Sequence, residues 1–409
     1  MRQIVAPETG AALPATFRRI VIVTASTRLR RAEVQVRQAT RTLAPSVAAA
    51  PPRLLYRLTR RLRELVIGLS RRLAPAPVVL YEQLTGVWHT EMIYVAARLE
   101  LADRLADGPQ TASALAAACG ADADALARLL RALVASGLFV RDGEGRYDNN
   151  RLSATLRRDA PDSMRDIVLY GGSAHSMQAW SRFFEVVESG TNGYQLAFGQ
   201  ALFDYLATHP DERATFNGAM VCLTRLELPA LARGYDYGAL ARICDVGGGR
   251  GTLMAAILSL HPALQGVVFD DAQVVAEAGP LLARWGVAER CATVGGSFFA
   301  EVPGGCDAYI LKEILHDWAD DDAVRILTAC RQAMKPGARL LVMEMLIVED
   351  GRSHPATLLD LQMLTATHDG RQRSRADFER LFARAGLRLR RVIDLATPSS
   401  IVEAEAMER

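Results

Sequence analysis

Four polar residues that could do chemistry come from four separate segments of the chain. Asp245 stands where we expect the strand in the apolar run ARICDV to end, and Asp270 ends the run GVVFD. His316 follows the run that ends at Lys312, and Glu344 ends the run RLLVME. Each run has the length and composition of a buried β-strand. Since ligands of an open parallel sheet bind outside the carboxyl ends of its strands, we expect these side chains to meet at one site.

A glycine-rich loop follows the first of these runs, in the stretch ICDVGGGRGTLMAAIL. Gly247 and Gly249 allow the backbone to turn tightly and to approach a ligand closely. A nicotinamide dinucleotide fingerprint, G-x-G-x-x-G, would need a third glycine at the position of Thr252. The loop therefore favours a smaller nucleoside ligand, with Asp245 able to attract a cation and Asp270 accepting hydrogen bonds from ribose hydroxyls.

The stretch LKEILHDWADDD places one histidine between an apolar run and a cluster of acids. A histidine with a pKa near ~6.5 can accept a proton from a reacting hydroxyl, so His316 is the candidate general base. The acids Asp320 to Asp322 are expected to begin a helix, because carboxylates there satisfy free N–H groups. Lys312 stands out, since the chain has 46 arginines and only two lysines.

The elements that must position these residues differ along the chain. Over residues 239–409, short apolar runs alternate with helical segments, which predicts a parallel sheet with helices on both faces. We expect an α/β catalytic domain with a doubly wound, Rossmann-like sheet there. Residues 173–238 are mostly helical and rich in large apolar side chains, some of which, including Met220, are expected to line a substrate pocket.

The pattern over residues 76–172 predicts helices, a turn at Gly120, a longer helix and a short hairpin around Gly143 and Gly145. This order is typical of a winged helix. A DNA-binding version would carry a cationic recognition helix, whereas residues 122–136 contain only two arginines among alanines and leucines. We therefore expect no nucleic-acid partner, and a ligand-binding winged-helix regulator is the alternative outside the enzymes.

Residues 1–75 form a basic extension with 15 arginines and three acids, although the whole chain has a net charge of only +2. The stretch RLLYRLTRRLRELVIGLSRRL predicts a helix with leucines on one face. Such a helix suits docking on the protein or on a partner subunit, or peripheral contact with an anionic membrane surface. No apolar run reaches the roughly 18 residues of a membrane span. Six widely spaced cysteines fit a reducing, cytoplasmic location without disulfides or a metal site.

Six segments together resemble the S-adenosylmethionine-dependent O-methyltransferases of the plant caffeate and bacterial polyketide type. In chain order they are DVGGGRG, FDDAQVV, GGSFF, LKEILHDW, DLQML and HDGRQRS. The resemblance runs from about residue 78 to 400 and includes the winged-helix unit, which in that family forms an intertwined homodimer. It implies S-adenosylmethionine as the cofactor and a hydroxylated small molecule as the acceptor.

The resemblance also implies roles for single residues. His316 would be the general base, and Glu344, hydrogen-bonded to the far ring nitrogen, would fix its tautomer. The cofactor-binding residues would be Asp245, Gly247, Gly249, Asp270, Ser297, Phe298 and Lys312. Apart from the resemblance, we expect Met220, Trp318 and Met363 to line the substrate pocket, and we count Gln372, which flanks the base, among the substrate-binding residues.

Two positions depart from the family pattern. Ser297 stands where the family usually has aspartate, so its bond to the adenine amino group would carry no charge. Gln372 stands where the family has a glutamate beside the base, and an amide does not raise the basicity of histidine as an anion does. Some relatives keep the fold and the cofactor without transferring a methyl group, which leaves that alternative open here.

We therefore predict an O-methyltransferase that acts on a phenolic or polyketide-like secondary metabolite. The sulfonium of the cofactor is already activated, so positioning of the acceptor oxygen supplies much of the catalysis. One alternative is a lipophilic, hydroxycarotenoid-like substrate methylated at a membrane surface. A nicotinamide oxidoreductase is a further alternative, against which Thr252 argues.

Overall fold

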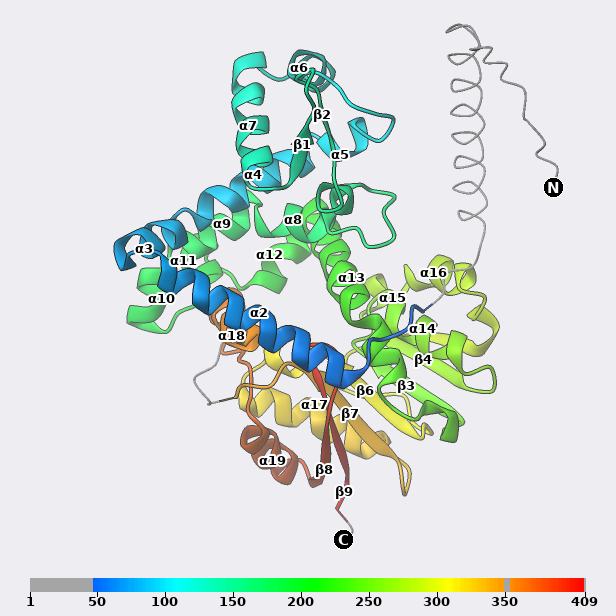
Figure 1. Cartoon of the computed structure of the whole chain (residues 1–409). Coiled ribbons are helices and arrows are strands. Elements are labelled where there is room, and N and C mark those ends of the chain that lie inside the picture. Colours follow the sequence, from blue (N-terminus) through cyan, green and yellow to red (C-terminus); the bar gives the residue numbers. More distant parts are fainter. Residues whose placement is uncertain (1–46, 349–353, 408–409) are drawn as a thin grey trace, which may run out of the picture. The chain divides into compact units, whose positions relative to one another are not determined.

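The computed structural model describes residues 47–348 and 354–407 (Figure 1). Most of the basic extension, residues 1–46, lies outside the described residues. The predicted basic helix is present as α2 (Arg53–Leu73), and it buries none of its side chains. Within the described ranges, no helix combines the length and hydropathy that a transmembrane span requires.

The region of the predicted winged helix contains the expected elements. Thr111 and Asp122 cap the two helices of the helix–turn–helix, and Gly120 ends the first of them in a left-handed conformation. Leucines of the second helix are buried in a small core, as a packing helix requires. The elements are α3 (Ala76–Leu84), α4 (Gly86–Arg98), α5 (Leu101–Arg104), α6 (Ala112–Cys119), α7 (Ala123–Ala135), β1 (Phe139–Arg141) and β2 (Tyr147–Asn149).

A helical segment follows a short 3₁₀ turn, η1 (Ser153–Leu156), and connects this region to the sheet domain. Aromatic side chains dominate its core, where Tyr194, Phe198 and Tyr205 pack together. Its helices are α8 (Arg165–Gly171), α9 (Ala174–Ser181), α10 (Phe183–Ser189), α11 (Gly193–Phe198), α12 (Leu202–Thr208) and the long α13 (Pro210–Arg233).

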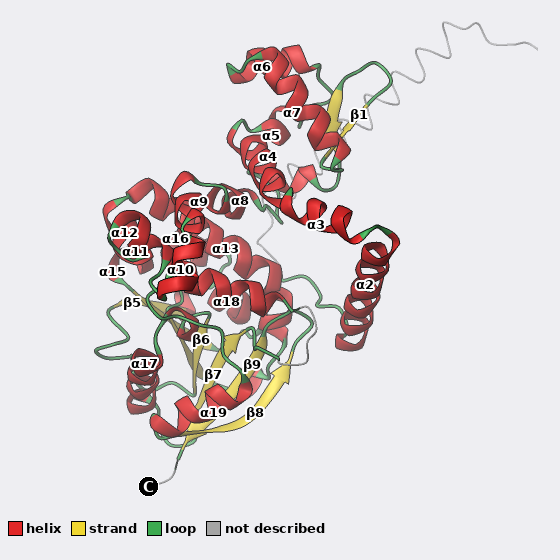
Figure 2. Ribbon diagram, turned by 90° about the vertical axis from the view of Figure 1, so that its left-hand side faces the viewer, coloured by secondary structure: helices red, strands yellow, loops and turns green. Residues whose placement is uncertain are grey.

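The C-terminal domain is built on a seven-stranded sheet in the order β5-β4-β3-β6-β7-β9-β8 (Figure 2). Five strands are parallel, as predicted: β3 (Arg242–Val246), β4 (Gln265–Asp270), β5 (Cys291–Gly295), β6 (Ala308–Lys312) and β7 (Arg339–Glu344). The last two, β8 (Leu387–Asp394) and β9 (Ser400–Ala406), are antiparallel and were not predicted. The sheet is therefore mixed.

Helices cover both faces of this sheet, which confirms the doubly wound, Rossmann-like prediction. Alternate residues of each central strand enter two separate cores, one shared with α14 and α16 and the other with α17 and α19. The helices are α14 (Thr252–Leu260), α15 (Ala272–Val275), α16 (Ala278–Arg284), α17 (Asp320–Ala333), α18 (Pro355–Ala366) and α19 (Arg375–Arg384). Short 3₁₀ turns are η2 (Tyr237–Ala239), η3 (Ala288–Arg290) and η4 (Leu315–Asp317).

The strand order places the predicted site residues together. Strand β3 lies between β4 and β6, so the order of connection reverses between β3 and β6. Ligands of open α/β sheets bind at the carboxyl ends of the strands on either side of such a reversal. Asp270 ends β4, Asp245 is the last residue but one of β3, and His316 lies four residues after the end of β6.

Candidate active site

His316 is buried in η4, and two separate segments hold it. Its Nδ1 lies 2.6 Å from Nε2 of Gln372, which is also buried. Its backbone N–H donates to Oε1 of Glu344 over 3.1 Å. The expectation that Glu344 bonds the far ring nitrogen is therefore wrong: Gln372 contacts the ring, and Glu344 fixes the backbone beneath it.

Burial sets the ionisation of this cluster. It lowers the pKa of His316 to about 4, with Glu313 opposing and Lys312 and Arg373 assisting the change. The imidazole is therefore neutral at pH 7 and able to accept a proton. Burial raises the pKa of Glu344 to about 7, against the influence of Arg373.

Asp317 was not singled out from the sequence, yet its Oδ1 lies 3.5 Å from Nε2 of His316. Burial raises its pKa well above the ordinary value, and the nearby carboxylates of Glu344 and Glu313 add to this change. Its position directly after the histidine was the only available signal. The acids that follow at Asp320 to Asp322 begin α17, as predicted.

Arg373 fixes the segment that carries the histidine. Its side chain is fully buried and donates to the carbonyl oxygens of Leu315 and Trp318 over 2.5 and 2.8 Å. It also bonds Oδ1 of Asp320 at 2.8 Å. These three partners lie on both sides of His316, so a single guanidinium holds both ends of its loop. In the sequence, this arginine stood out only as part of the segment HDGRQRS.

Backbone strain lies on either side of the histidine. Glu313 and Asp369 adopt φ values of 51° and 61°, a left-handed conformation that is rare for residues other than glycine. At Gly370, a Cβ atom would lie 2.5 Å from the carbonyl oxygen of His316, so only glycine fits against this loop. Such strain persists where the surrounding structure holds the backbone in place, and it is common at active sites.

The glycine-rich loop and Asp270 form the expected cofactor side. The N–H of Gly249 donates to Oδ2 of Asp270 over 2.8 Å, which ties the loop to the end of β4. Gly247 has a φ of 74°, and a Cβ atom there would clash with Ile314. Each carboxylate oxygen of Asp270 can accept a further bond, which suits the diol of a ribose.

Asp245 and Lys312 lie in a buried cluster of charges at the ends of β3 and β6. Burial raises the pKa of Asp245 to about 7, with Lys312 opposing and Asp270 assisting the change. Lys312 Nζ pairs with Glu313 over 2.5 Å. Although burial lowers the pKa of Lys312, the carboxylates of Glu313 and Glu227 raise it above its ordinary value. Glu227, from α13, was not predicted to lie here.

Trp318 joins the cofactor side to the helical segment through aromatic contacts. It stacks on Phe203 of α12 with the ring centroids 6.2 Å apart, and it meets the edge of Phe298 at 6.0 Å. Ser297 is exposed beside Phe298. Met220 in α13 is partly buried and Met363 in α18 is buried. The described contacts do not join these two methionines to His316, so their role in a substrate pocket stays a prediction.

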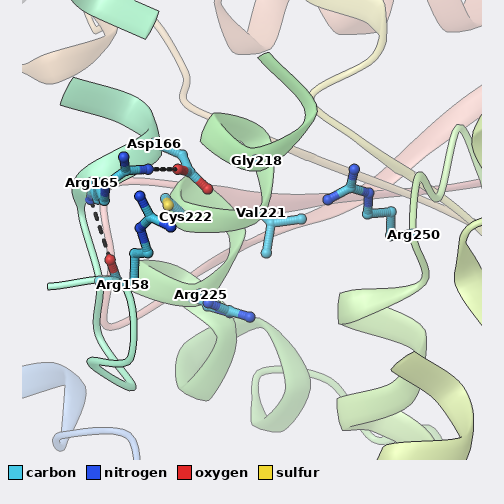
Figure 3. A pocket seen from close by; sticks show the side chains of 9 residues that line it. Arg158, Arg165, Asp166, Gly218, Val221, Cys222, Arg225 and Arg250 are labelled. Atoms are coloured by element: carbon cyan, nitrogen blue, oxygen red, sulfur yellow. Dashed lines mark hydrogen bonds and ion pairs between the residues drawn. The ribbon is translucent and has the colours of Figure 1, made fainter. Parts of the chain in front are cut away.

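A separate cavity of about 170 Å³ lies beside α13 (Figure 3). Its lining includes Arg158 from the segment before α8, Arg165 at the start of α8, and Arg225 from α13. Arg250 of the glycine-rich loop also lines it and pairs with Glu277 over 2.5 Å. None of the predicted site residues lines this polar cavity, so the acceptor is expected to bind elsewhere.

Two family models match the chain over the regions described above. The O-methyltransferase domain matches residues 180–388, and the O-methyltransferase dimerisation domain matches residues 81–159. The fold and site thus define a methyltransferase with its own dimerisation region. The chain belongs to the S-adenosylmethionine-dependent O-methyltransferase family, as its motifs predicted.

The relatives act in specialised metabolism. The chain is similar to a phenazine O-methyltransferase of Lysobacter antibioticus, with 38% identity over 81% of this chain and 96% of the relative. It is also similar to the 8-amino-8-demethylriboflavin N,N-dimethyltransferase of Streptomyces davaonensis, with 38% identity over 75% of this chain and 89% of that relative. The chain is also similar to a solved O-methyltransferase from neocarzinostatin biosynthesis, whose structure contains S-adenosylmethionine and 2-hydroxy-5-methyl naphthoic acid. The two structures superpose with a TM-score of 0.67 at 35% sequence identity, and the match covers 78% of this chain and 96% of that one.

Proposed function

We propose that this enzyme methylates a hydroxyl group on an aromatic or polyketide-like metabolite and that His316 is the general base. One observation carries the proposal: a buried, neutral histidine follows β6 at the carboxyl edge of the sheet, two residues after Ile314, which lies against Gly247 of the glycine-rich loop. S-adenosylmethionine supplies an activated methyl group when bound. The protein has only to orient the acceptor oxygen and remove its proton.

The reaction forms a bond between the acceptor oxygen and the methyl carbon and breaks the bond between that carbon and sulfur. The hydroxyl proton passes to Nε2 of His316, and the thioether leaves uncharged. Gln372 would hold the ring through Nδ1, and Glu344 would hold the loop through the backbone N–H. An imidazolium forms during the step, and the nearby charge of Glu313, which acts to raise the pKa of His316, favours it.

The remaining site residues have proposed binding roles. For the cofactor these residues are Asp245, Gly247, Gly249, Asp270, Ser297, Phe298 and Lys312. For the acceptor they are Met220, Trp318, Met363 and Gln372. The Gly247 backbone, which leaves no room for a side chain, and the acceptor oxygens of Asp270 fit a nucleoside ligand.

Aromatic acceptors are supported by the names of the relatives, which include a phenazine and a naphthoic acid. The stacked rings of Trp318 and Phe203 offer a flat surface of the same kind. A lipophilic hydroxycarotenoid is not favoured. An aromatic amine is the second candidate acceptor, because one relative is an N,N-dimethyltransferase.

We also propose the division of the chain into a basic extension (1–75), a dimerisation domain (76–172), a helical segment (173–238) and a catalytic domain (239–409). The family model for dimerisation supports a homodimer. Limited proteolysis of the full chain, with the cut sites read by mass spectrometry, tests these boundaries.

Methyl transfer to a panel of hydroxylated phenazines, naphthoates and benzoates, with matched aminoarenes, tests the proposed activity by mass spectrometry. We expect O-methylated products from at least one aromatic class. His316→Ala should lower the turnover number by roughly 10²–10⁴ while S-adenosylmethionine still binds. Turnover within about threefold of the original enzyme would show that His316 is not the base, because general-base catalysis contributes more than that.

A further inference from the structure

Helix α2 lies before both family models, the first of which begins at residue 81. Its apolar side faces away from the rest of the chain. The exposed fraction reaches 62% at Leu62 and 70% at Leu65. The exposed apolar residues of the helix are Leu54, Leu55, Leu58, Leu62, Leu65, Val66, Ile67, Leu69 and Leu73. A surface helix normally turns this face toward its own core.

The polar side of α2 faces its own chain instead. The half-buried positions are Tyr56, Arg60, Glu64 and Gly68, which recur every four residues and so form one stripe. Near the start of the helix, Arg57 pairs with Asp394 of β8. At 3.6 residues per turn, the leucines lie on the opposite side from this stripe. The helix is therefore held with its apolar face outward. Figure 2 shows α2 at the right-hand edge of the ribbon.

The spacing of the leucines is that of a helix that pairs with another helix. Leu55, Leu58, Leu62, Leu65 and Leu69 are separated by three, four, three and four residues. This is the a and d pattern of a coiled-coil seam, with leucine at all five positions. We call these five residues the leucine seam.

Exposed apolar residues continue from the leucine seam into the family's dimerisation region. Leu80, Tyr81, Leu84 and Trp88 of α3 and α4 are all exposed. An apolar groove of about 400 Å³ follows farther along, lined by residues of α4 and α7. Apolar surface of this extent on one chain marks an interface. Since residues 81–159 match a dimerisation domain, the partner that covers α3 and α4 is a second copy of this chain.

We propose that α2 is an added dimerisation arm whose leucine seam packs against a helix of a second copy of this chain. This inference does not depend on the acceptor or on the role of His316. An anionic membrane is the competing occupant of the same face, because the helix also carries seven arginines. The experiment below separates these two outcomes.

The test compares two triple variants of the full chain. Leu58→Gln/Leu62→Gln/Leu65→Gln removes the centre of the leucine seam. Thr59→Gln/Arg63→Gln/Ser70→Gln places the same residue at three exposed positions of the same helix outside the seam. Because none of these side chains is buried within one chain, both variants should keep the circular dichroism spectrum and thermal unfolding of the original.

Sedimentation with fluorescence detection, from low nanomolar to micromolar protein, measures the dimer–monomer midpoint. We expect the midpoint concentration of the seam variant to be roughly 100-fold higher or more than that of the original protein. Each leucine that is buried in the dimer strengthens the association constant about tenfold or more. The control variant should stay within about threefold. An unchanged midpoint for the seam variant overturns the proposal.

Flotation with phosphatidylserine-containing vesicles identifies the competing occupant. If the seam variant loses vesicle binding while its dimer–monomer midpoint is unchanged, the face binds a membrane and the proposal is wrong. If neither protein floats and only the seam variant dissociates, the second copy is the occupant.

Discussion

The side-chain amide of Gln372 lies 2.6 Å from Nδ1 of His316, across 56 residues of sequence. If the amide nitrogen of Gln372 points toward the ring, it donates to Nδ1, and the proton of the neutral imidazole sits on Nε2. Nε2 then cannot accept a proton from the acceptor. With the amide turned over, Oε1 accepts from Nδ1–H and Nε2 is free. With the other orientation, Oε1 of Gln372 lies buried with no partner among the described residues, whereas the turned amide gives this oxygen the Nδ1–H donor.

Replacing Gln372 by glutamate should strengthen the base. A carboxylate at this position accepts only, so it fixes the proton at Nδ1 and raises the pKa of His316, which burial holds at about 4. The histidine is active when neutral, and activity is lost as the pH falls through its pKa. The acid limb of the pH profile for kcat should therefore move to higher pH in Gln372→Glu.

The pH profile of kcat for the original enzyme and for Gln372→Glu, measured with one acceptor, checks this shift. Gln362→Glu is the matched control, because Gln362 accepts a bond from Trp180 and not from the histidine. An acid limb that moves equally in both variants, or in neither, contradicts the assigned role of Gln372.

Ser297→Asp should tighten binding of S-adenosylmethionine. Ser297 is exposed next to Phe298 and would contact the adenine amino group as a neutral acceptor. A carboxylate makes a charge-assisted bond, which is roughly twice as strong, so we expect the dissociation constant to fall by about fivefold. Titration calorimetry measures it, with Ser297→Ala as the variant expected to bind more weakly. Equal affinity of all three proteins would remove Ser297 from the cofactor site.

The convergence of Asp245, Asp270 and His316 could be predicted because it depends only on strand order and direction. Apolar runs that alternate with helices make a parallel sheet, and the end of each run lies at the same edge. Strands β8 and β9 were missed because their sequences, LRLRRVID and SIVEAEA, carry charged residues that pair with one another across the strands. These strands lack the continuous apolar pattern of the buried ones.

The contacts within the site could not be predicted in the same way. Glu344 was expected at the imidazole ring and instead bonds the backbone, because a position on a strand does not fix how far a side chain reaches. The bonds of Arg373 span 53 to 58 residues and leave no local pattern. Strand ends follow from periodicity, whereas hydrogen bonds between loops depend on the finished fold.

Binding of S-adenosylmethionine should release protons and weaken as the pH falls. Burial raises the pKa of Asp245 to about 7, so much of this carboxyl is protonated at and below pH 7. A cationic sulfonium nearby favours the charged form, so the affinity should fall by up to about tenfold per pH unit below 7. Calorimetry in buffers of different ionisation enthalpy counts the released protons. In Asp245→Asn the proton release and the pH dependence should both disappear, and their persistence would assign them to another group.

Arg373→Met should lower both stability and turnover. The substitution keeps an unbranched apolar stem but removes the guanidinium, which leaves the carbonyl oxygens of Leu315 and Trp318 without these donors. Each such loss costs about 1–3 kcal/mol, so we expect the free energy of unfolding to fall by about 2–6 kcal/mol in urea titrations. Arg375→Met is the control, since Arg375 is largely exposed and its pair with Glu379 contributes no more than about 1 kcal/mol.

In Arg373→Met the loop of His316 would also lose its fixed position, so kcat should fall more than the affinity for S-adenosylmethionine. If the two variants unfold alike and keep the same kcat, Arg373 does not hold the catalytic loop.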